Sequence, residues 1–231
     1  MNAPARALVV GAHPDDAELF AGGTIAGWID QGCEVAVLIL TDGRLGSPDP
    51  SVDPDEVAAT RAREAHTAAA VLGVRHVLLE RHPDGGLAPR RPEATEAVAR
   101  AIRNLRPEIV IGHDPWRPYE LHPDHRAAGF ATTDGTVAAR EHHAIGALAD
   151  LPAHRSRALW LAGGASPTRW VEIDATFERK LDALASHASQ FDHLEGWRER
   201  VRAWNAGIGE ERGYRLAEAF RVIDLPGHDY D

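Results

Sequence analysis

Short apolar runs alternate with segments of helical periodicity along most of this chain. The clearest run is EVAVLILT, residues 34–41, in which apolar residues occupy successive positions between polar ends. A strand that is apolar on both sides is typical of a parallel sheet covered by helices on both faces. The alternation predicts βαβ units. We therefore expect one α/β domain, residues 1–231, with a Rossmann-like, mostly parallel sheet flanked by helices.

The same two patterns place the other elements. We expect strands over residues 6–11, 34–41, 74–80, 108–112, 157–162 and 169–173. We expect helices over residues 18–30, 54–72, 92–105, 125–142, 177–187 and 194–206. Gly73 is a common helix stop and predicts the end of the second helix. Residues 216–224 fit either a late strand or a helix.

Charge and cysteine content exclude several classes of protein. The chain has 35 acidic and 25 basic residues, a formal net charge of −10, which argues against nucleic acid or an anionic membrane as a partner. Cys33 is the only cysteine, so neither an intramolecular disulfide nor a cysteine cluster for zinc is available. No apolar segment is long enough for a secretion signal or a spanning helix. We therefore expect a cytoplasmic protein.

The tripeptide His-Pro-Asp occurs three times, at residues 13–15, 82–84 and 122–124, each time after an expected strand. Turn chemistry alone explains a single copy, since proline and aspartate favour turns. The first and last copies extend into AHPDDAE, residues 12–18, and HPDH, residues 122–125. In a doubly wound sheet the first and fourth strands are often neighbours at the switch point. We expect these two loops to face each other across one crevice.

Histidine and carboxylate side chains from both loops would then surround one point. They are His13, Asp15, Asp16, His122, Asp124 and His125. Two imidazoles and one carboxylate, with water in the remaining position, form a typical catalytic zinc set. Ferrous iron accepts the same ligand types, so the residues favour Zn²⁺ and leave Fe²⁺ open. The spacing alone does not decide which histidine of HPDH binds the metal.

These motifs resemble those of the PIG-L/LmbE family of metal-dependent N-deacetylases, which remove acetyl groups from N-acetylglucosamine units. The pair AHPDDAE and HPDH carries the resemblance, and weaker matches extend it over roughly residues 8 to 190. The weaker matches are TDGRLGS (41–47), Arg61 with Glu64, PDGGL (83–87), HDPW (113–116) and HASQF (187–191).

The resemblance implies a role for each residue of the two main motifs. The implied metal ligands are His13, Asp16 and His125. Asp15 would be the general base that acts on the metal-bound water. His122 would stabilise the oxyanion or protonate the leaving amine, and Asp124 would orient the His122 ring. His113 and Asp114 are expected to support the site rather than bind the metal.

Four further residues are expected to contact the substrate: Arg61, Asp84, Trp116 and Glu120. Arg61 equally fits a salt bridge with Glu64, and for Asp84 a role in closing a turn is slightly favoured over a substrate contact. The mycothiol branch of the family tends to carry tyrosine where Glu120 stands, which argues against mycothiol as the substrate. We expect a small amino-sugar substrate with an N-acyl group, acted on by a monomer or a homo-oligomer.

Three alternatives stay open at this point. The first is a thiol-conjugate or broad-specificity amidase of the same family, with little preference for sugars. The second is a non-haem iron oxygenase in which His13, Asp15 and His125 form the facial triad, although that chemistry usually occurs in a double-stranded β-helix. The third is a non-catalytic sugar-binding relative, which would have lost a base or a ligand that this chain retains.

Overall fold

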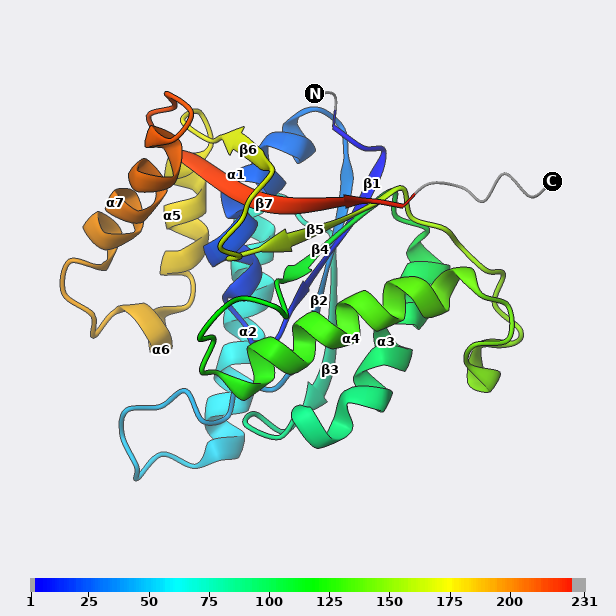
Figure 1. The fold of residues 1–231 in the computed structure, drawn as a ribbon. Helices are drawn as coiled ribbons and strands as arrows, with labels where there is room; N and C mark the ends of the chain where they lie inside the picture. Colours follow the sequence, from blue (N-terminus) through cyan, green and yellow to red (C-terminus); the bar gives the residue numbers. More distant parts are fainter. Residues whose placement is uncertain (1–2, 226–231) are drawn as a thin grey trace.

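The computed structural model describes residues 3–225 of the chain. A seven-stranded sheet in the order β3-β2-β1-β4-β5-β7-β6 forms its centre, with helices on both faces (Figure 1). Strands β1 to β5 run parallel, whereas β7 is antiparallel to both of its neighbours. The expected α/β class and mostly parallel sheet are confirmed. The expected domain bounds, 1–231, include eight terminal residues that lie outside the described part.

The elements follow the expected alternation, with ends that differ by a few residues. The strands are β1 (Arg6–Gly11), β2 (Glu34–Thr41), β3 (His76–His82), β4 (Ile109–His113), β5 (Ala158–Ala162), β6 (Arg169–Glu172) and β7 (Ala217–Asp224). The α-helices are α1 (Asp16–Asp30), α2 (Pro54–Leu72), α3 (Arg91–Leu105), α4 (Pro123–Arg140), α5 (Phe177–Ala185), α6 (Ala188–Phe191) and α7 (Trp197–Glu210). Two short 3₁₀ helices span Ala88–Arg90 and Gly146–Leu148. Residues 216–224, which fitted either a strand or a helix, contain the strand β7.

Alternate residues of β2 point to opposite faces of the sheet, and both faces are buried. One face carries Val35, Val37 and Ile39, which belong to the same apolar cluster as residues of α1 and α2. The other face carries Ala36, Leu38 and Leu40, which share a cluster with residues of α3 and α4. Burial on both sides explains why the sequence of this strand is continuously apolar.

Strand β1 has parallel neighbours on both sides, β2 and β4. The chain winds outward from β1 to β3 and then returns to β4 on the opposite side, so the β1–β4 boundary is the switch point of the sheet. The loops that follow β1 and β4 therefore lie at the same edge, as the sequence predicted.

The local sequence fixes where α4 begins at this edge. His122 is the N-cap, and its Nδ1 accepts a hydrogen bond from the backbone N–H of Asp124 at 3.3 Å. Pro123 occupies the first helical position, where its missing N–H leaves no bond unmade. The cap places His122 and His125 on the first turn of α4, at the switch point.

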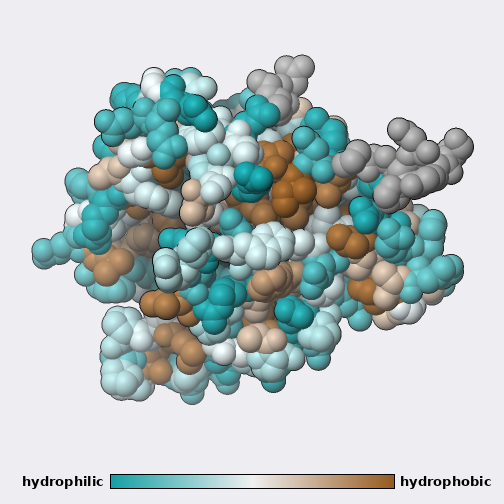
Figure 2. All heavy atoms as spheres, viewed as in Figure 1, coloured by the Kyte–Doolittle hydropathy of each residue, from teal (hydrophilic) through white to brown (hydrophobic). Residues whose placement is uncertain are grey.

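None of the helices within residues 3–225 is both long and apolar enough to cross a membrane. On the face in Figure 2, hydrophobic residues occur in small groups between hydrophilic ones. The cytoplasmic location expected from the sequence stays a prediction, and the choice between a monomer and a homo-oligomer stays open.

Candidate metal centre and active site

The loop from β1 into α1 places His13 beside Asp16. Asp16 Oδ2 accepts a hydrogen bond from the backbone N–H of His13 at 2.8 Å and lies 3.6 Å from His13 Nδ1. Between them, Asp15 has a φ of 112°, a region that residues with a side chain rarely adopt. Strained backbone of this kind is concentrated at functional sites.

Two histidines approach Asp16 from the other side of the switch point. His113, the last residue of β4, has its Nε2 3.0 Å from Asp16 Oδ2. His125, on the first turn of α4, has its Nε2 3.6 Å from Asp16 Oδ1. Burial would raise the pKa of Asp16, but His113 and His13 outweigh it and hold that pKa well below its usual range. Asp16 is thus the ionised centre at which the two loops meet.

Three groups of side chains among the described residues could hold a metal ion. They are His13–His122–His125, Asp16–His113–His125 and His13–Asp84–Asp124, each with ligand atoms within 4.8 Å of one another. The expected ligands, His13, Asp16 and His125, are spread over the first two groups. Tetrahedral zinc with bonds of about 2.0–2.2 Å needs ligand atoms about 3.3–3.6 Å apart. His13 Nδ1 lies 3.6 Å from Asp16 Oδ2 and His125 Nε2 lies 3.6 Å from Asp16 Oδ1, so each histidine is within that range of one oxygen of the carboxylate.

Negative charge gathers around His13. Its Nε2 lies 3.1 Å from Asp84 Oδ1 and 3.5 Å from Asp124 Oδ2. Burial disfavours the charged ring, yet Asp124, Asp16 and Asp84 together raise the pKa of His13 to about 12. Buried carboxylates need compensating positive charge, and a divalent cation at this point would supply it. The charge and the donor types of the cluster both fit Zn²⁺ or Fe²⁺.

Each expected histidine ligand has its outer ring nitrogen next to a carboxylate. Asp84 and Asp124 hold Nε2 of His13, which leaves Nδ1 toward Asp16. Glu120 Oε1 lies 3.7 Å from Nδ1 of His125, which leaves Nε2 toward the cluster. Outer carboxylates of this kind fix the tautomer and the orientation of metal-binding histidines.

Two residues expected to contact substrate are engaged by the protein instead. Asp84 contacts His13 Nε2 through one oxygen and accepts the backbone N–H of Leu45 at 3.1 Å through the other. Glu120 accepts the backbone N–H of His122 at 3.0 Å, in addition to its contact with a ligand histidine. Both carboxylates therefore orient the histidines and their loops, and the substrate contacts expected of Asp84 and Glu120 stay predictions.

Asp124 also differs from its expected role. Its carboxylate is fully buried and accepts the backbone N–H groups of Gly85 at 2.7 Å and Leu87 at 3.1 Å. It is the backbone N–H of Asp124, and not the carboxylate, that contacts the His122 ring. Since Nδ1 accepts that bond, the neutral His122 ring carries its proton on Nε2, from which it can donate.

Arg61 lies beneath the first loop and is only 4% exposed. It donates to the carbonyl oxygens of Gly43 at 3.0 Å and Pro14 at 2.6 Å, and its Nη2 lies 3.0 Å from Asp15 Oδ2. Burial raises the pKa of Asp15 to about 6, although the Arg61 guanidinium opposes the rise. The Arg61 guanidinium therefore positions Asp15, and the substrate contact expected of Arg61 stays a prediction.

The contact between Asp15 and Arg61 also argues against a non-haem iron oxygenase. That alternative required His13, Asp15 and His125 to converge as a facial triad. Asp16 lies between the two histidines, whereas Asp15 pairs with Arg61. The α/β sheet likewise differs from the double-stranded β-helix of that class.

The late motif HASQF supports this edge from behind. Glu64 of α2 accepts hydrogen bonds from the backbone N–H of Ser189 at 2.8 Å and from its hydroxyl at 2.7 Å. His187 is fully buried, with Nε2 3.6 Å from Glu18 Oε2. Burial would lower the pKa of His187, but Glu18 raises it overall. Glu64 therefore holds the late motif in place rather than pairing with Arg61.

His113 is closer to the cluster than the sequence analysis expected, since it belongs to one of the three candidate metal groups. The available signal was its position directly after a strand, like that of His13. Trp116, in contrast, is 56% exposed and rests edge-on against Phe130 of α4, with ring centroids 5.9 Å apart. The structure therefore brings His113 into the site and leaves Trp116 at its rim.

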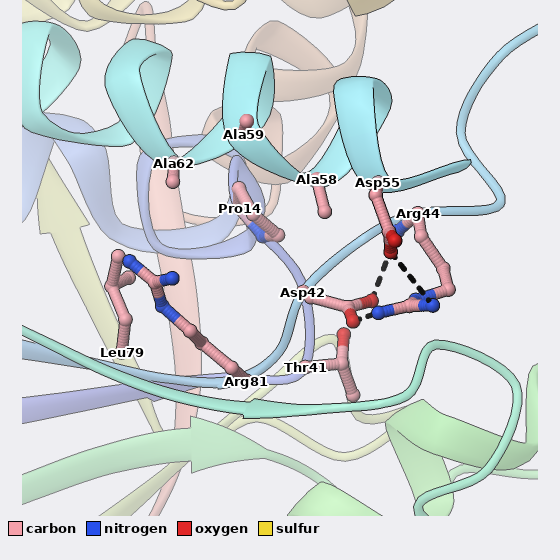
Figure 3. Close-up of a pocket in the computed structure, with 10 residues that line it drawn as sticks. All are labelled: Pro14, Thr41, Asp42, Arg44, Asp55, Ala58, Ala59, Ala62, Leu79 and Arg81. Atoms are coloured by element: carbon pink, nitrogen blue, oxygen red, sulfur yellow. Dashed lines mark hydrogen bonds and ion pairs between the residues drawn. The ribbon is translucent and has the colours of Figure 1, made fainter. Parts of the chain in front are cut away.

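Two cavities flank the cluster and differ in their lining. A cavity of about 280 Å³ lies on the α2 side, where alanines of α2 face Arg81 and where Arg44 links Asp42 to Asp55 (Figure 3). Pro14 lines it, but none of its lining residues belongs to the three metal groups. A smaller cavity of about 80 Å³ is lined by Asp16, His113 and His125, among others. Open space beside the cluster therefore lies on the β4–β5 side.

Comparison with known proteins places this geometry in context. The family described as PIG-L, GlcNAc-PI de-N-acetylase, matches residues 8–136, which include both loops of the site. The diacetylchitobiose deacetylase of Thermococcus kodakarensis is 35% identical over 222 residues, covering 94% of this chain and 83% of the relative. The 1D-myo-inositol 2-acetamido-2-deoxy-α-D-glucopyranoside deacetylase of Actinosynnema mirum is 29% identical over 273 residues, covering 100% and 92%.

Solved structures show the same relationship. The N,N′-diacetylchitobiose deacetylase of Pyrococcus horikoshii, complexed with its inhibitor MPG, matches with a TM-score of 0.90 and 32% identity, covering 96% of this chain and 84% of that one. The 4-carboxy-2-hydroxymuconate hydratase GalB of Pseudomonas putida matches with a TM-score of 0.77 and 23% identity, covering 98% of each chain. The second likeness shows the fold alone.

Proposed function

The chain belongs to the PIG-L family of de-N-acetylases, and on that premise we propose that it is a metal-dependent hydrolase that removes the N-acyl group of a small amino sugar. The observation that carries the proposal is the convergence of His13, Asp16 and His125 beside Asp15 and His122. The relatives named as deacetylases of amino-sugar compounds support the substrate class.

The metal ligands in this proposal are His13 through Nδ1, Asp16 through its carboxylate and His125 through Nε2. These atoms already face one another, because carboxylates occupy the outer ring nitrogens of both histidines. When bound, Zn²⁺ lowers the pKa of a water molecule to about 7 and polarises the amide carbonyl of the substrate. Fe²⁺ would be accepted by the same donors.

Asp15 is the general base in the proposed mechanism. Arg61 occupies its Oδ2 at 3.0 Å, which leaves Oδ1 to accept a proton from the attacking water. A pKa of about 6 keeps the carboxylate ionised at neutral pH and still basic enough to take that proton. The buried guanidinium holds the carboxylate in place during the transfer.

His122 stabilises the oxygen that becomes negative as water adds to the carbonyl carbon. Its Nδ1 is occupied by the backbone N–H of Asp124, so Nε2–H is the donor. Its ring stacks on that of His125, with centroids 4.5 Å apart, which keeps it beside the cluster. A donor directed at a developing oxyanion contributes about 10²–10³ in rate.

Amine release from a panel of N-acetyl amino sugars tests the proposal. The purified chain is stripped with a chelator, reloaded with Zn²⁺ or Fe²⁺, and assayed for free amine. We expect release only from the reloaded protein. His142→Ala, at an exposed position outside the described metal groups, is the matched control and should keep full activity. The proposal is contradicted if the metal-stripped protein still releases amine, or if the reloaded protein releases amine from none of the sugars.

A thiol-conjugate or broad-specificity amidase would use the same centre, so the substrate has to separate the two. The discriminating quantity is kcat/KM for N-acetylglucosaminides relative to simple N-acetylated amines. A pocket that hydrogen-bonds hydroxyl groups rejects analogues without them by up to about 10⁴-fold. Equal values for the two substrate types would favour the broad amidase.

A further inference from the structure

Space beside the metal centre continues toward α7. The cavity of about 80 Å³ at Asp16, His113 and His125 adjoins a second cavity of about 190 Å³. The two cavities share four lining residues: Phe20, Arg117, Gly163 and Trp204. They therefore form one groove, which we call the α7 groove. It leaves the centre between the loops after β4 and β5 and reaches α7, which packs on β7 at this end of the sheet (Figure 1).

Apolar side chains contribute to the lining at both ends, alongside charged ones such as Arg117, which is common to both parts, and Glu211 in the far part. Leu19, Phe20 and Ala162 line the part next to the metal centre. Trp204, which is 43% exposed, stands between the two parts, and Trp170 and Ile208 line the far part. Bound carbon chains gain stability by covering surfaces of this kind, in proportion to the apolar area removed from water.

The chemistry of the site indicates which part of a substrate enters the groove. Once water has added, the reacting carbon carries two oxygens, the nitrogen and the acyl chain. The oxygens and the nitrogen need proton donors or acceptors, which Asp15 and His122 supply. Among the described residues that line the groove, neither of these two is present. The sugar on the nitrogen carries hydroxyl groups that need polar partners, whereas the acyl chain needs none. The acyl chain is therefore the substituent that fits the apolar part of this lining.

We propose that the α7 groove binds the acyl group of the substrate and that the enzyme releases acyl groups longer than acetyl. The inference rests on the proposed function and names the acyl specificity of the same site. In the reaction the C–N bond breaks, the hydroxyl of water joins the carbonyl carbon and its proton goes to the amine. The products are a carboxylic acid of matching length and the free amino sugar.

The far end of the groove is more polar than its entrance. Asn205 is fully buried there, and its Nδ2 donates to the carbonyl oxygen of Ala217 at 2.8 Å. Its Oδ1 has no partner among the described residues. A plain alkyl chain that reached this point would leave the oxygen unpaired, which is unfavourable in a buried setting. We therefore expect a short chain, ending near Trp204, to be preferred over a long one.

A chain-length series tests the proposal. N-acetyl-, N-butyryl- and N-hexanoylglucosamine are compared by kcat/KM with the metal-loaded enzyme. Burial of each methylene is worth about threefold to fourfold in binding, so N-butyryl should exceed N-acetyl by on the order of tenfold. Trp204→Ala should lose most of this advantage, which is measured as the ratio of kcat/KM for N-butyryl- to N-acetylglucosamine. Trp197→Ala, on the same helix but outside the groove, is the matched control.

A second variant fills the groove instead of widening it. Ala165 lines the far cavity on an exposed loop, so Ala165→Trp should reduce hydrolysis of the longer chains and spare N-acetyl. Ser166→Trp, at the neighbouring position outside the lining, should change neither. A kcat/KM that falls tenfold or more from N-acetyl to N-butyryl in the wild-type protein would overturn the proposal.

Two further outcomes separate this inference from its alternatives. Trp204→Ala could instead change the ratio of kcat/KM for N,N′-diacetylchitobiose to that for N-acetylglucosamine and leave the chain-length profile unchanged. In that case the groove holds a second sugar and the proposal is wrong. Titration calorimetry with Asp15→Asn protein measures the binding of the same acyl series without turnover. Tighter binding of N-butyryl- than of N-acetylglucosamine to this variant supports the groove, even if the wild-type protein hydrolyses neither compound. The absence of hydrolysis would count against the proposed function and not against the groove.

Discussion

The two sides of the active site are built differently. The inner side comes from the loops after β1 and β3 with Arg61, and its side chains are buried: His13 is 7% exposed and Arg61 is 4% exposed. The outer side is the loop between β4 and α4, where Tyr119 is 95% exposed and Leu121 is 85% exposed. Buried hydrogen-bonded groups hold a fixed geometry, whereas the residues of an exposed rim can change without disturbing that geometry. We infer that the inner side fixes the base and two of the three proposed metal ligands, His13 and Asp16, and that the outer side meets the substrate.

Replacement of Asp16 should have the largest effect, because Asp16 joins the two sides. Asp16→Asn keeps an oxygen that can accept the His13 N–H but removes the charge that faces three histidines. We expect loss of bound metal and a fall in activity beyond the factor of about 10²–10⁴ for a lost base. Metal content and amine release measure both effects. A variant that keeps its metal would show that the centre does not depend on this carboxylate.

Asp15→Asn tests the base on the inner side by itself. The amide can still face Arg61, but it cannot take a proton from water. We expect metal content and thermal stability close to wild type, with kcat reduced by about 10²–10⁴. Turnover near the wild-type value would remove Asp15 from the mechanism and leave the inner side with a structural role only.

His122→Ala tests the contribution of the outer side to the chemistry. The loss of the Nε2–H donor should reduce kcat by about 10²–10³, with the metal retained. Asp124→Asn is unsuitable as a control, because its carboxylate also contacts His13. His143→Ala, at an exposed position after α4, serves instead and should be silent. A simultaneous loss of metal in His122→Ala would add His122 to the ligand set of His13, Asp16 and His125.

Asp84→Asn should have a smaller effect that is specific to metal binding. Asp84 contacts His13 Nε2 and the backbone of the loop after β2, and a neutral amide weakens the first contact. Removal of such an outer partner typically costs 10–100-fold in metal affinity or activity. Competition with a chelator measures the affinity. An unchanged affinity with a raised KM would return Asp84 to the substrate-contacting role expected from the sequence.

Tyr119→Ala should have the smallest effect of the series. The side chain is almost fully exposed, at a position with a φ of 60°. Surface substitutions away from packed features usually change stability little. We expect kcat within about twofold of wild type and any change confined to KM. A large loss of kcat would show that the outer rim is as finely organised as the inner side.

The fold was predictable from the sequence because its signals are local. The apolar run 35–40 is typical of a strand buried on both faces of a covered parallel sheet, and Gly73 ends a helix through its left-handed backbone, with a φ of 90°. The meeting of the loops after β1 and β4 followed from parallel topology alone. Residues 216–224 could not be assigned, since pairing with β5 and β6, which are distant in sequence, selects the strand.

The site was predictable in its residue types but less so in its contacts. Sequence spacing places Asp84, Glu120 and Asp124 near the centre, yet it does not state where a carboxylate points. Those directions depend on backbone N–H groups contributed by other loops, such as those of Leu45 and Gly85. The sequence predicts only a supporting role for His113, because its contacts also depend on other segments. Its approach to Asp16 depends on how β4 is placed beside β1, which a single chain segment does not encode.

The choice of third ligand tests the central claim most directly, because His125 and His113 both approach Asp16. The measurement is the Zn²⁺ affinity of His125→Ala and His113→Ala by competition with a chelator. The account predicts that His125→Ala loses stoichiometric metal, whereas His113→Ala keeps it with an affinity lowered by about 10–100-fold. Stoichiometric metal in His125→Ala together with its loss in His113→Ala would contradict the assigned centre.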